Sequence, residues 1–121
     1  MTWLAVFVGG ALGALSRHAV DVLFEAARPW PTVAINILGC LAIGALAGWL
    51  QSHPSPRSWW QPFLATGFLG GFTTMSAYAV HTWTLSSSGQ TPAALVYACL
   101  TLVGSIAAAA VGLRVTAQVR R

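Results

Sequence analysis

The sequence predicts a small all-α integral membrane protein with four transmembrane helices. Of its 121 residues, 56% are hydrophobic and only 7% are charged, which is far too apolar for a soluble domain of this size. No charged residue occurs between Arg57 and Arg114, an interval long enough for two spans of about 20 residues each. Two further apolar stretches precede Arg57, so we expect four membrane-crossing helices in total.

The four apolar segments follow one another in a single membrane domain that covers residues 1–121. They are residues 2–26, 31–50, 59–86 and 92–115. Each is long enough to cross a hydrocarbon core about 30 Å thick. Stretches rich in proline, serine and glycine separate them, as expected of loops.

The first segment, residues 2–26, carries an arginine inside an apolar run. It lacks the basic start of a cleavable signal peptide, so we expect it to remain as a span. Gly9 and Gly13 share one helix face, which is typical of close helix packing. Arg17 is costly at this depth unless it snorkels, with Asp21 as an i,i+4 partner, or lines an aqueous cavity. Both interpretations remain open, and in the second the fixed charge raises the local concentration of anions.

The second segment, residues 31–50, contains a single amide side chain, that of Asn36. This amide must face protein or water because lipid cannot satisfy its donors and acceptor. It either forms a hydrogen bond between helices or donates to an anion. Gly44 and Gly48 repeat the four-residue spacing of small residues and predict a second close helix contact.

The third segment, residues 59–86, contains a stretch unusually rich in glycine and hydroxyl side chains. Its sequence is Gly67-Phe68-Leu69-Gly70-Gly71-Phe72-Thr73-Thr74-Met75-Ser76. Glycine weakens a helix interior, so the adjacent Gly70 and Gly71 predict a break near residues 70–73. Backbone groups freed inside a membrane must be received by protein or by a hydrated path.

The fourth segment, residues 92–115, presents a stripe of hydroxyl groups on one face. Tyr97, Thr101 and Ser105 recur every four residues. A lone Ser or Thr in a span usually bonds to its own backbone, but a stripe indicates more than packing. Gly104 and Gly112, with Ala108 between them, predict another close helix contact.

Charge and residue spacing exclude several classes of function. The net charge of +4 does not indicate nucleic-acid binding, because the arginines are scattered instead of clustered. His18, His53 and His81 lack the short spacing of zinc ligands, and no paired nucleophile and base suggests an enzyme.

An even number of spans places the N-terminus, Arg57 and the C-terminal arginines on one side, which the positive-inside rule makes cytoplasmic. Arg28 lies on the opposing side, so the bias is modest and insertion in both orientations stays open. Dual insertion would let one sequence build an antiparallel dimer.

Three motifs together resemble the Fluc (CrcB) family of small fluoride channels. They are the glycine-rich run from Gly10 to Arg17, Asn36 with Gly39, and the stretch from Gly67 to Ser76. The motifs occur in the order and in the spans where the family carries them, and the resemblance covers nearly the whole chain.

The resemblance implies an antiparallel, dual-topology dimer with two fluoride pores. It also implies a structural sodium ion on the two-fold axis, held by the backbone carbonyls of Gly70 and Thr73. Such carbonyls are hard oxygen ligands suited to a hard cation. The implied activity is passive, electrogenic export of cytoplasmic fluoride across the plasma (inner) membrane, which the chain crosses several times.

A pore selective for fluoride must replace tightly held water by strong donors at close range. The amide of Asn36 and the hydroxyls of Ser76 and Ser105 are such donors. The full set of predicted fluoride-pore residues is Asn36, Met75, Ser76, Tyr78, Thr101 and Ser105, with Arg17 in a vestibule.

The chain departs from the family after the Thr-Thr pair. The family carries two phenylalanines there, whose positive ring edges face the anion. This chain has Met75 and Tyr78 at those positions. A thioether has no such edge, and Tyr78 adds a hydroxyl.

Two alternative functions compete with the channel. A small proton-coupled multidrug antiporter also has four short spans, but it needs a carboxylate deep in the membrane, and Asp21 and Glu25 lie close to a loop. A noncatalytic membrane assembly subunit would use the glycines and hydroxyls for packing alone. The partner in the dimer is a second copy of the chain or an oppositely inserted homologue.

Overall fold

The computed structural model describes residues 1–52 and 59–118, and nearly all of them are helical. The elements are α1 (Thr2–Leu23), the 3₁₀ helix η1 (Glu25–Ala27), α2 (Trp30–Ser52), the π-helix η2 (Pro62–Leu69), α3 (Gly70–Phe72), α4 (Met75–Ser87) and α5 (Thr91–Gln118). Four helical stretches are long and apolar enough to cross a membrane: Thr2–Leu23, Trp30–Gln51, Pro62–Ser87 and Thr91–Gln118. The prediction of an all-α protein with four such stretches is therefore confirmed.

Several residues used in the sequence predictions lie outside the described part of the chain. They are His53, Arg57, Arg120 and Arg121. The orientation inferred from the arginines therefore stays a prediction.

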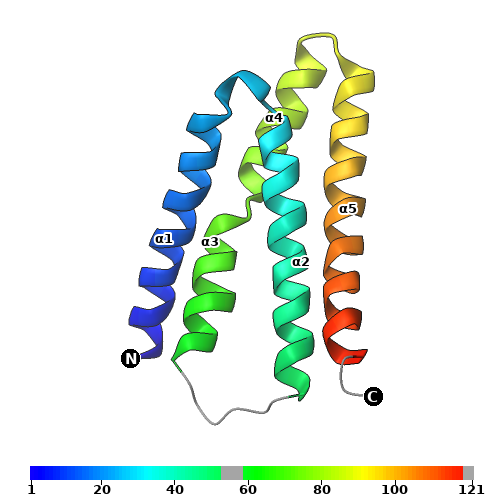
Figure 1. The fold of residues 1–121 in the computed structure, drawn as a ribbon. Coiled ribbons are helices and arrows are strands. Elements are labelled where there is room, and N and C mark those ends of the chain that lie inside the picture. Colours follow the sequence, from blue (N-terminus) through cyan, green and yellow to red (C-terminus); the bar gives the residue numbers. More distant parts are fainter. Residues whose placement is uncertain (53–58, 119–121) are drawn as a thin grey trace.

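The helices stand side by side in a bundle, with the start of α1 and the end of α5 at the same end (Figure 1). α2 and α5 pack against each other along much of their length, and α1 packs against η2 and α3. α4 contacts α5, so the third span begins beside α1 and ends beside α5. This path carries the stretch between α3 and α4 through the middle of the bundle.

Proline and glycine set the helix ends. α2 begins at Trp30 and α5 at Thr91, each directly before a proline, which the first helical turn tolerates because its N–H groups have no helical partner. α1 ends at Leu23, earlier than predicted, and the short η1 follows it. Gly89, between α4 and α5, has a φ of 80°, a conformation that glycine adopts without a steric penalty.

The predicted contacts of the small residues are confirmed. A Cβ on Gly13 would lie 2.9 Å from the backbone N of Phe72, and one on Gly9 would lie 3.1 Å from the Cα of Gly67. Across the other helix pair, a Cβ on Gly112 would lie 2.7 Å from the backbone N of Ala45. These glycines allow α1 to approach η2 and α3, and α5 to approach α2, backbone to backbone.

The two adjacent glycines of the third span are themselves helical, unlike the residues that follow them. Gly70 has φ −64° and ψ −35°, whereas Thr73 and Thr74 are extended, with ψ values of 156° and 124°. Gly71 is needed for a close approach, because a Cβ there would lie 3.0 Å from the Cα of Gly10 on α1. The helical geometry ends at Phe72 and resumes at Met75.

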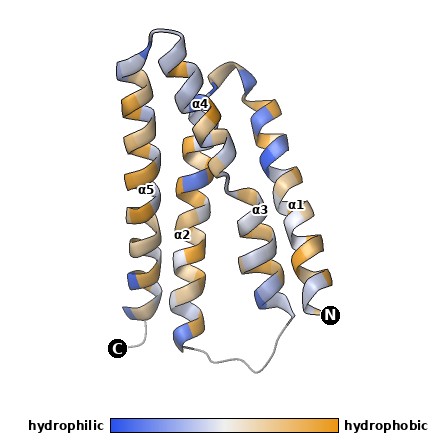
Figure 2. Cartoon of the chain, turned by 180° about the vertical axis from the view of Figure 1, so that it is seen from behind, coloured by the Kyte–Doolittle hydropathy of each residue, from blue (hydrophilic) through white to orange (hydrophobic). Residues whose placement is uncertain are grey.

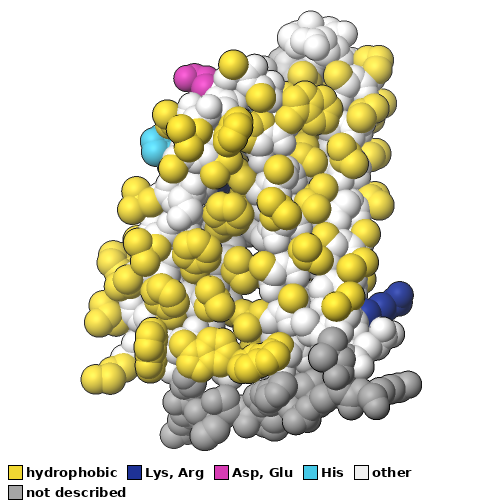
Figure 3. Space-filling model, in the orientation of Figure 1, with side chains coloured by type: hydrophobic (Ala, Val, Ile, Leu, Met, Phe, Trp, Pro, Cys, Tyr) yellow, Lys and Arg dark blue, Asp and Glu magenta, His cyan; other side chains and the backbone are white. Residues whose placement is uncertain are grey.

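The outer surface of the bundle is apolar. Figure 2 shows the helices coloured as hydrophobic along most of their length, and Figure 3 shows hydrophobic side chains covering most of one face. Trp3, Phe7 and Val103 are 86%, 74% and 63% exposed. Such a surface suits contact with lipid, where exposed apolar groups carry no penalty.

We predict that Gly71→Ala lowers the free energy of unfolding by about 1–3 kcal/mol, because the added methyl group overpacks the contact with Gly10. Gly70→Ala is the matched control, since the nearest atom to a Cβ there is 3.9 Å away. Denaturant titration in detergent micelles measures both variants. Equal stabilities would contradict the close approach of α3 to α1.

Candidate functional site

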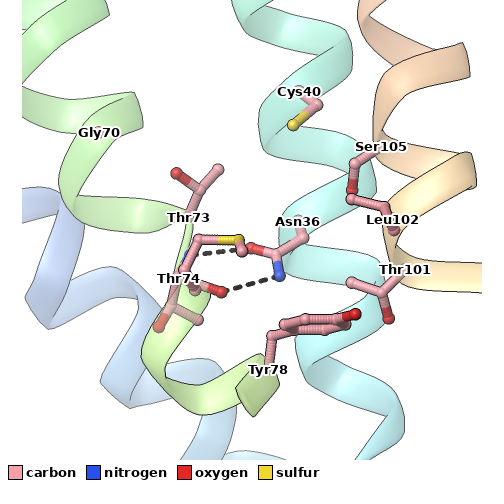
Figure 4. A pocket seen from close by; sticks show the side chains of 10 residues that line it. Asn36, Cys40, Gly70, Thr73, Thr74, Tyr78, Thr101, Leu102 and Ser105 are labelled. Atoms are coloured by element: carbon pink, nitrogen blue, oxygen red, sulfur yellow. Dashed lines mark hydrogen bonds between the residues drawn. The ribbon is translucent and has the colours of Figure 1, made fainter. Parts of the chain in front are cut away.

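The extended residues between α3 and α4 are held by one side chain of α2. Asn36 donates from Nδ2 to the carbonyl oxygen of Thr74 at 3.0 Å. The backbone N–H of Thr74 donates to Oδ1 of Asn36 at 2.8 Å. Figure 4 shows the two bonds as a reciprocal pair. Both residues are only 6% exposed, so Asn36 satisfies backbone groups that lipid could not.

The pairing with Thr74 does not use every hydrogen-bond donor of Asn36. An amide nitrogen carries two N–H donors, and Thr74 uses one of them. The structure therefore shows that Asn36 forms a hydrogen bond between spans, which is one of the two roles that the sequence left open. The second N–H of its amide can still donate to another acceptor.

Two backbone carbonyls beside this pairing lose their helical donors. In an uninterrupted helix the N–H of Thr74 would donate to the carbonyl of Gly70, but it donates to Asn36 instead. The N–H of Ala77 would likewise donate to the carbonyl of Thr73, but it donates to Oγ1 of Thr74 at 3.2 Å. The two carbonyls that the resemblance assigned to a sodium ion, those of Gly70 and Thr73, thus both lack their helical partners.

A cavity of about 320 Å³ lies beside this interruption, between the third span and α2 and α5 (Figure 4). We call it the first cavity. Its lining includes seven of the predicted site residues: Asn36, Gly70, Thr73, Met75, Tyr78, Thr101 and Ser105. Cys40, Thr74 and Leu102 complete it. The sequence thus identified most of a lining that comes from three different spans.

The hydroxyl groups of the first cavity differ in what they can still donate. Thr101 gives its proton to the carbonyl of Tyr97 at 2.7 Å, and Thr73 gives its proton to the carbonyl of Leu69 at 3.1 Å. The Oγ of Ser105 is buried and has no hydrogen-bond partner within residues 1–52 and 59–118. Ser105 therefore offers this cavity a hydroxyl donor that no other described group uses.

The two residues at the family's phenylalanine positions have different surroundings. Met75 is 70% exposed. Tyr78 stacks on Tyr97, with ring centroids 5.9 Å apart and an interplanar angle of 23°. Tyr97 is fully buried, so Tyr78 packs against a buried ring of α5, whereas Met75 is mostly exposed.

A second cavity of about 360 Å³ lies on the α1 side of the interruption. Its polar lining comes from α1 and from the third span: Arg17, His18, Asp21, Thr74, Ser76 and His81. Arg17 thus borders a cavity, as one of its two interpretations required. Ser76 lies here and not in the first cavity, with its Oγ 3.2 Å from Oγ1 of Thr74.

Thr74 borders both cavities. Among the described residues it is the one that the two linings share.

Sequence reasoning missed several lining residues, although local signals existed for some. Cys40 follows Asn36 by four positions and so shares its helix face. His81 follows Thr74 by seven positions, two turns along the third span. Leu102 could not be predicted in this way, because an apolar residue in an apolar helix does not indicate whether it borders a cavity.

The carboxylates lie away from the middle of the spans. Glu25 is in η1, where its Oε1 lies 3.3 Å from Nη1 of Arg28, and its side chain is 71% exposed. Asp21 lies in the last turn of α1 and borders the second cavity. Neither is the deeply placed acid that a proton-coupled antiporter requires.

Comparison with known proteins gives a consistent set of relatives. Residues 4–113 match the profile of the family described as CrcB-like protein, Camphor Resistance (CrcB). The fluoride-specific ion channel FluC of Paracoccus denitrificans is 44% identical, over 94% of this chain and 93% of its own length. The fluoride-specific ion channel FluC 2 of Nitrobacter hamburgensis is 41% identical, over 93% of this chain and 91% of its own.

We predict that Asn36→Ala accelerates hydrogen exchange in residues 73–77 by roughly tenfold to a hundredfold, because an unpaired buried backbone group costs about 1–3 kcal/mol. Exchange measured by mass spectrometry in micelles tests this, with the amides of α5 as the internal reference and Cys99→Ser as the control variant. Unchanged exchange in residues 73–77 would show that Asn36 does not hold the interruption.

Proposed function

Because the chain belongs to the CrcB-like family, we propose that it is a passive, electrogenic channel selective for fluoride. The names of its relatives, fluoride-specific ion channels about 40% identical over most of the chain, support this activity. The chain is not an enzyme in this proposal, and fluoride crosses the membrane down its own gradient. The expected location is the plasma (inner) membrane, where such a channel exports cytoplasmic fluoride.

The observation that carries the proposal is the supply of unused donors in the first cavity. Fluoride is small and strongly hydrated, so a site for it must replace water with hydrogen bonds. Two residues that border this cavity carry such donors: Asn36 has an N–H that Thr74 does not use, and Ser105 has a buried hydroxyl without a partner in the described part of the chain. Thr101 and Thr73 contribute hydroxyl oxygens whose protons are already used.

Arg17 and Ser76 border the second cavity and act in this proposal as the vestibule. The positive charge of Arg17 raises the concentration of anions beside the interruption. Ser76 then donates to an anion that approaches Thr74, which borders both cavities.

We further propose that two copies of the chain, or the chain and a homologue, form an antiparallel dimer around a structural sodium ion. The freed carbonyls of Gly70 and Thr73 fit such an ion, because hard cations prefer oxygen ligands. Each copy supplies two carbonyls. The positive charge of the ion would balance the partial negative charges of these oxygens. Its coordination by both copies would connect their two interrupted third spans.

Met75 and Tyr78 take the positions of the family's phenylalanines in this channel. Tyr78, stacked on Tyr97, retains an aromatic ring at the first cavity. Met75 lacks a ring edge, so its polarisable thioether supplies only a weak contact to an anion.

We predict that vesicles containing the purified chain release fluoride electrogenically, with chloride moving at least a hundredfold more slowly. A fluoride electrode and a chloride electrode on matched vesicles measure both rates, and a potassium ionophore tests whether the flux carries charge. Comparable rates for the two anions would overturn the proposed selectivity.

We predict that Ser105→Ala slows fluoride flux by roughly tenfold to a hundredfold, because a hydrogen bond to a charged group contributes about 1.5–3 kcal/mol. The variant still elutes as a dimer in size-exclusion chromatography. Loss of the dimer would favour the assembly-subunit alternative instead.

Thr101→Val is the matched comparison on the same stripe, because the Thr101 proton is already donated to Tyr97. This variant slows the flux less than Ser105→Ala does. The opposite order would contradict the assignment of Ser105 as the donor.

A further inference from the structure

Two sulfur atoms of different chemistry border the first cavity. Cys40 comes from α2 and Met75 from the start of α4. Neither belongs to the hydrogen-bonding machinery described above. Figure 4 shows Cys40 one turn beyond Asn36 on α2, and Ser105 on the neighbouring α5 borders the same cavity.

The Cys40 thiol is chemically available. It is free of any disulfide and only partly buried. The Oγ of Ser105, which borders the same cavity, is buried without a partner in the described part of the chain. An unpaired buried oxygen costs free energy that a ligand can recover.

The donor set selects a class of ligand. Among the described lining residues, the first cavity has no carboxylate and no imidazole, the groups that hold calcium, magnesium and most zinc ions. A thiolate and a thioether are soft ligands, which favour soft cations such as Cu(I). Two sulfur ligands suffice for a monovalent d¹⁰ ion, because such ions accept twofold coordination.

We propose that Cys40 and Met75 form a binding site for soft monovalent cations of the Ag(I) and Cu(I) class, and that its occupation blocks the first cavity. The Cys40 thiol loses its proton to water and its sulfur binds the metal, and the Met75 sulfur donates a lone pair. No electron is transferred. The proposed metal site does not depend on the proposed function. The proposed block of anion passage does depend on it.

Competitive alkylation of the wild-type protein tests the site directly. N-ethylmaleimide reacts with Cys40 and Cys99 in increasing concentrations of silver nitrate, in chloride-free buffer, and mass spectrometry measures both modified peptides. Cys99, the other free cysteine, lies exposed on α5 and does not border the first cavity. Silver should protect Cys40 at concentrations at least tenfold below those that protect Cys99.

Met75→Leu keeps the apolar volume and removes the sulfur. In this variant the silver concentration that protects Cys40 should rise about tenfold, towards that of Cys99. Equal protection of both cysteines in the wild type, or no effect of Met75→Leu, would overturn the two-sulfur site.

Fluoride efflux from vesicles tests the block, with each variant compared to its own rate without silver. Silver should block the wild type and Cys99→Ser at the same concentration, and Cys40→Ser should require at least thirtyfold more. Protection of Cys40 without any block would overturn the second half of the proposal. If the wild type shows no fluoride flux, the proposed function fails and the alkylation experiment still decides the metal site.

Discussion

The structure depends on one constraint, which is that backbone groups released inside an apolar span must find partners within the protein. The third span stops being helical at Thr73 and Thr74. Asn36 meets this requirement by forming two hydrogen bonds with the backbone of Thr74. The Oδ1 of Asn36 therefore replaces the helical acceptor that the N–H of Thr74 has lost, and its Nδ2 adds a donor to the Thr74 carbonyl, although the two residues lie far apart in the sequence.

The hydrogen bonds made by Thr74 determine which backbone groups near it are left without helical partners. Its N–H and that of Ala77 turn to side-chain oxygens, so the carbonyls of Gly70 and Thr73 lose their helical donors. Oxygen ligands and hydrogen-bond donors thus appear at the same level of the bundle. One interruption accounts for the proposed sodium ligands and for the hydrogen bonds that hold the Asn36 amide, one of the proposed fluoride donors.

Close helix packing makes this arrangement possible. Gly71 allows α3 to meet Gly10 on α1, which fixes the third span on the α1 side before the interruption. α4 then packs against α5, and Tyr78 stacks on Tyr97 there. The change of neighbour between α3 and α4 leaves a cavity on each side of Thr74.

The sequence by itself determined the four spans, the small-residue contacts and most of the polar lining. Hydropathy and spacing act locally, and a polar group such as Asn36 or Ser105 stands out in an apolar run. Only the tertiary structure decided that Gly71 serves packing while the extended residues are Thr73 and Thr74, and that Ser76 and Ser105 border different cavities. It also decided that Cys40 shares a cavity with Met75. Each of these depends on which backbone lies opposite a residue, and helical periodicity gives the face of a residue but not the partner across from it.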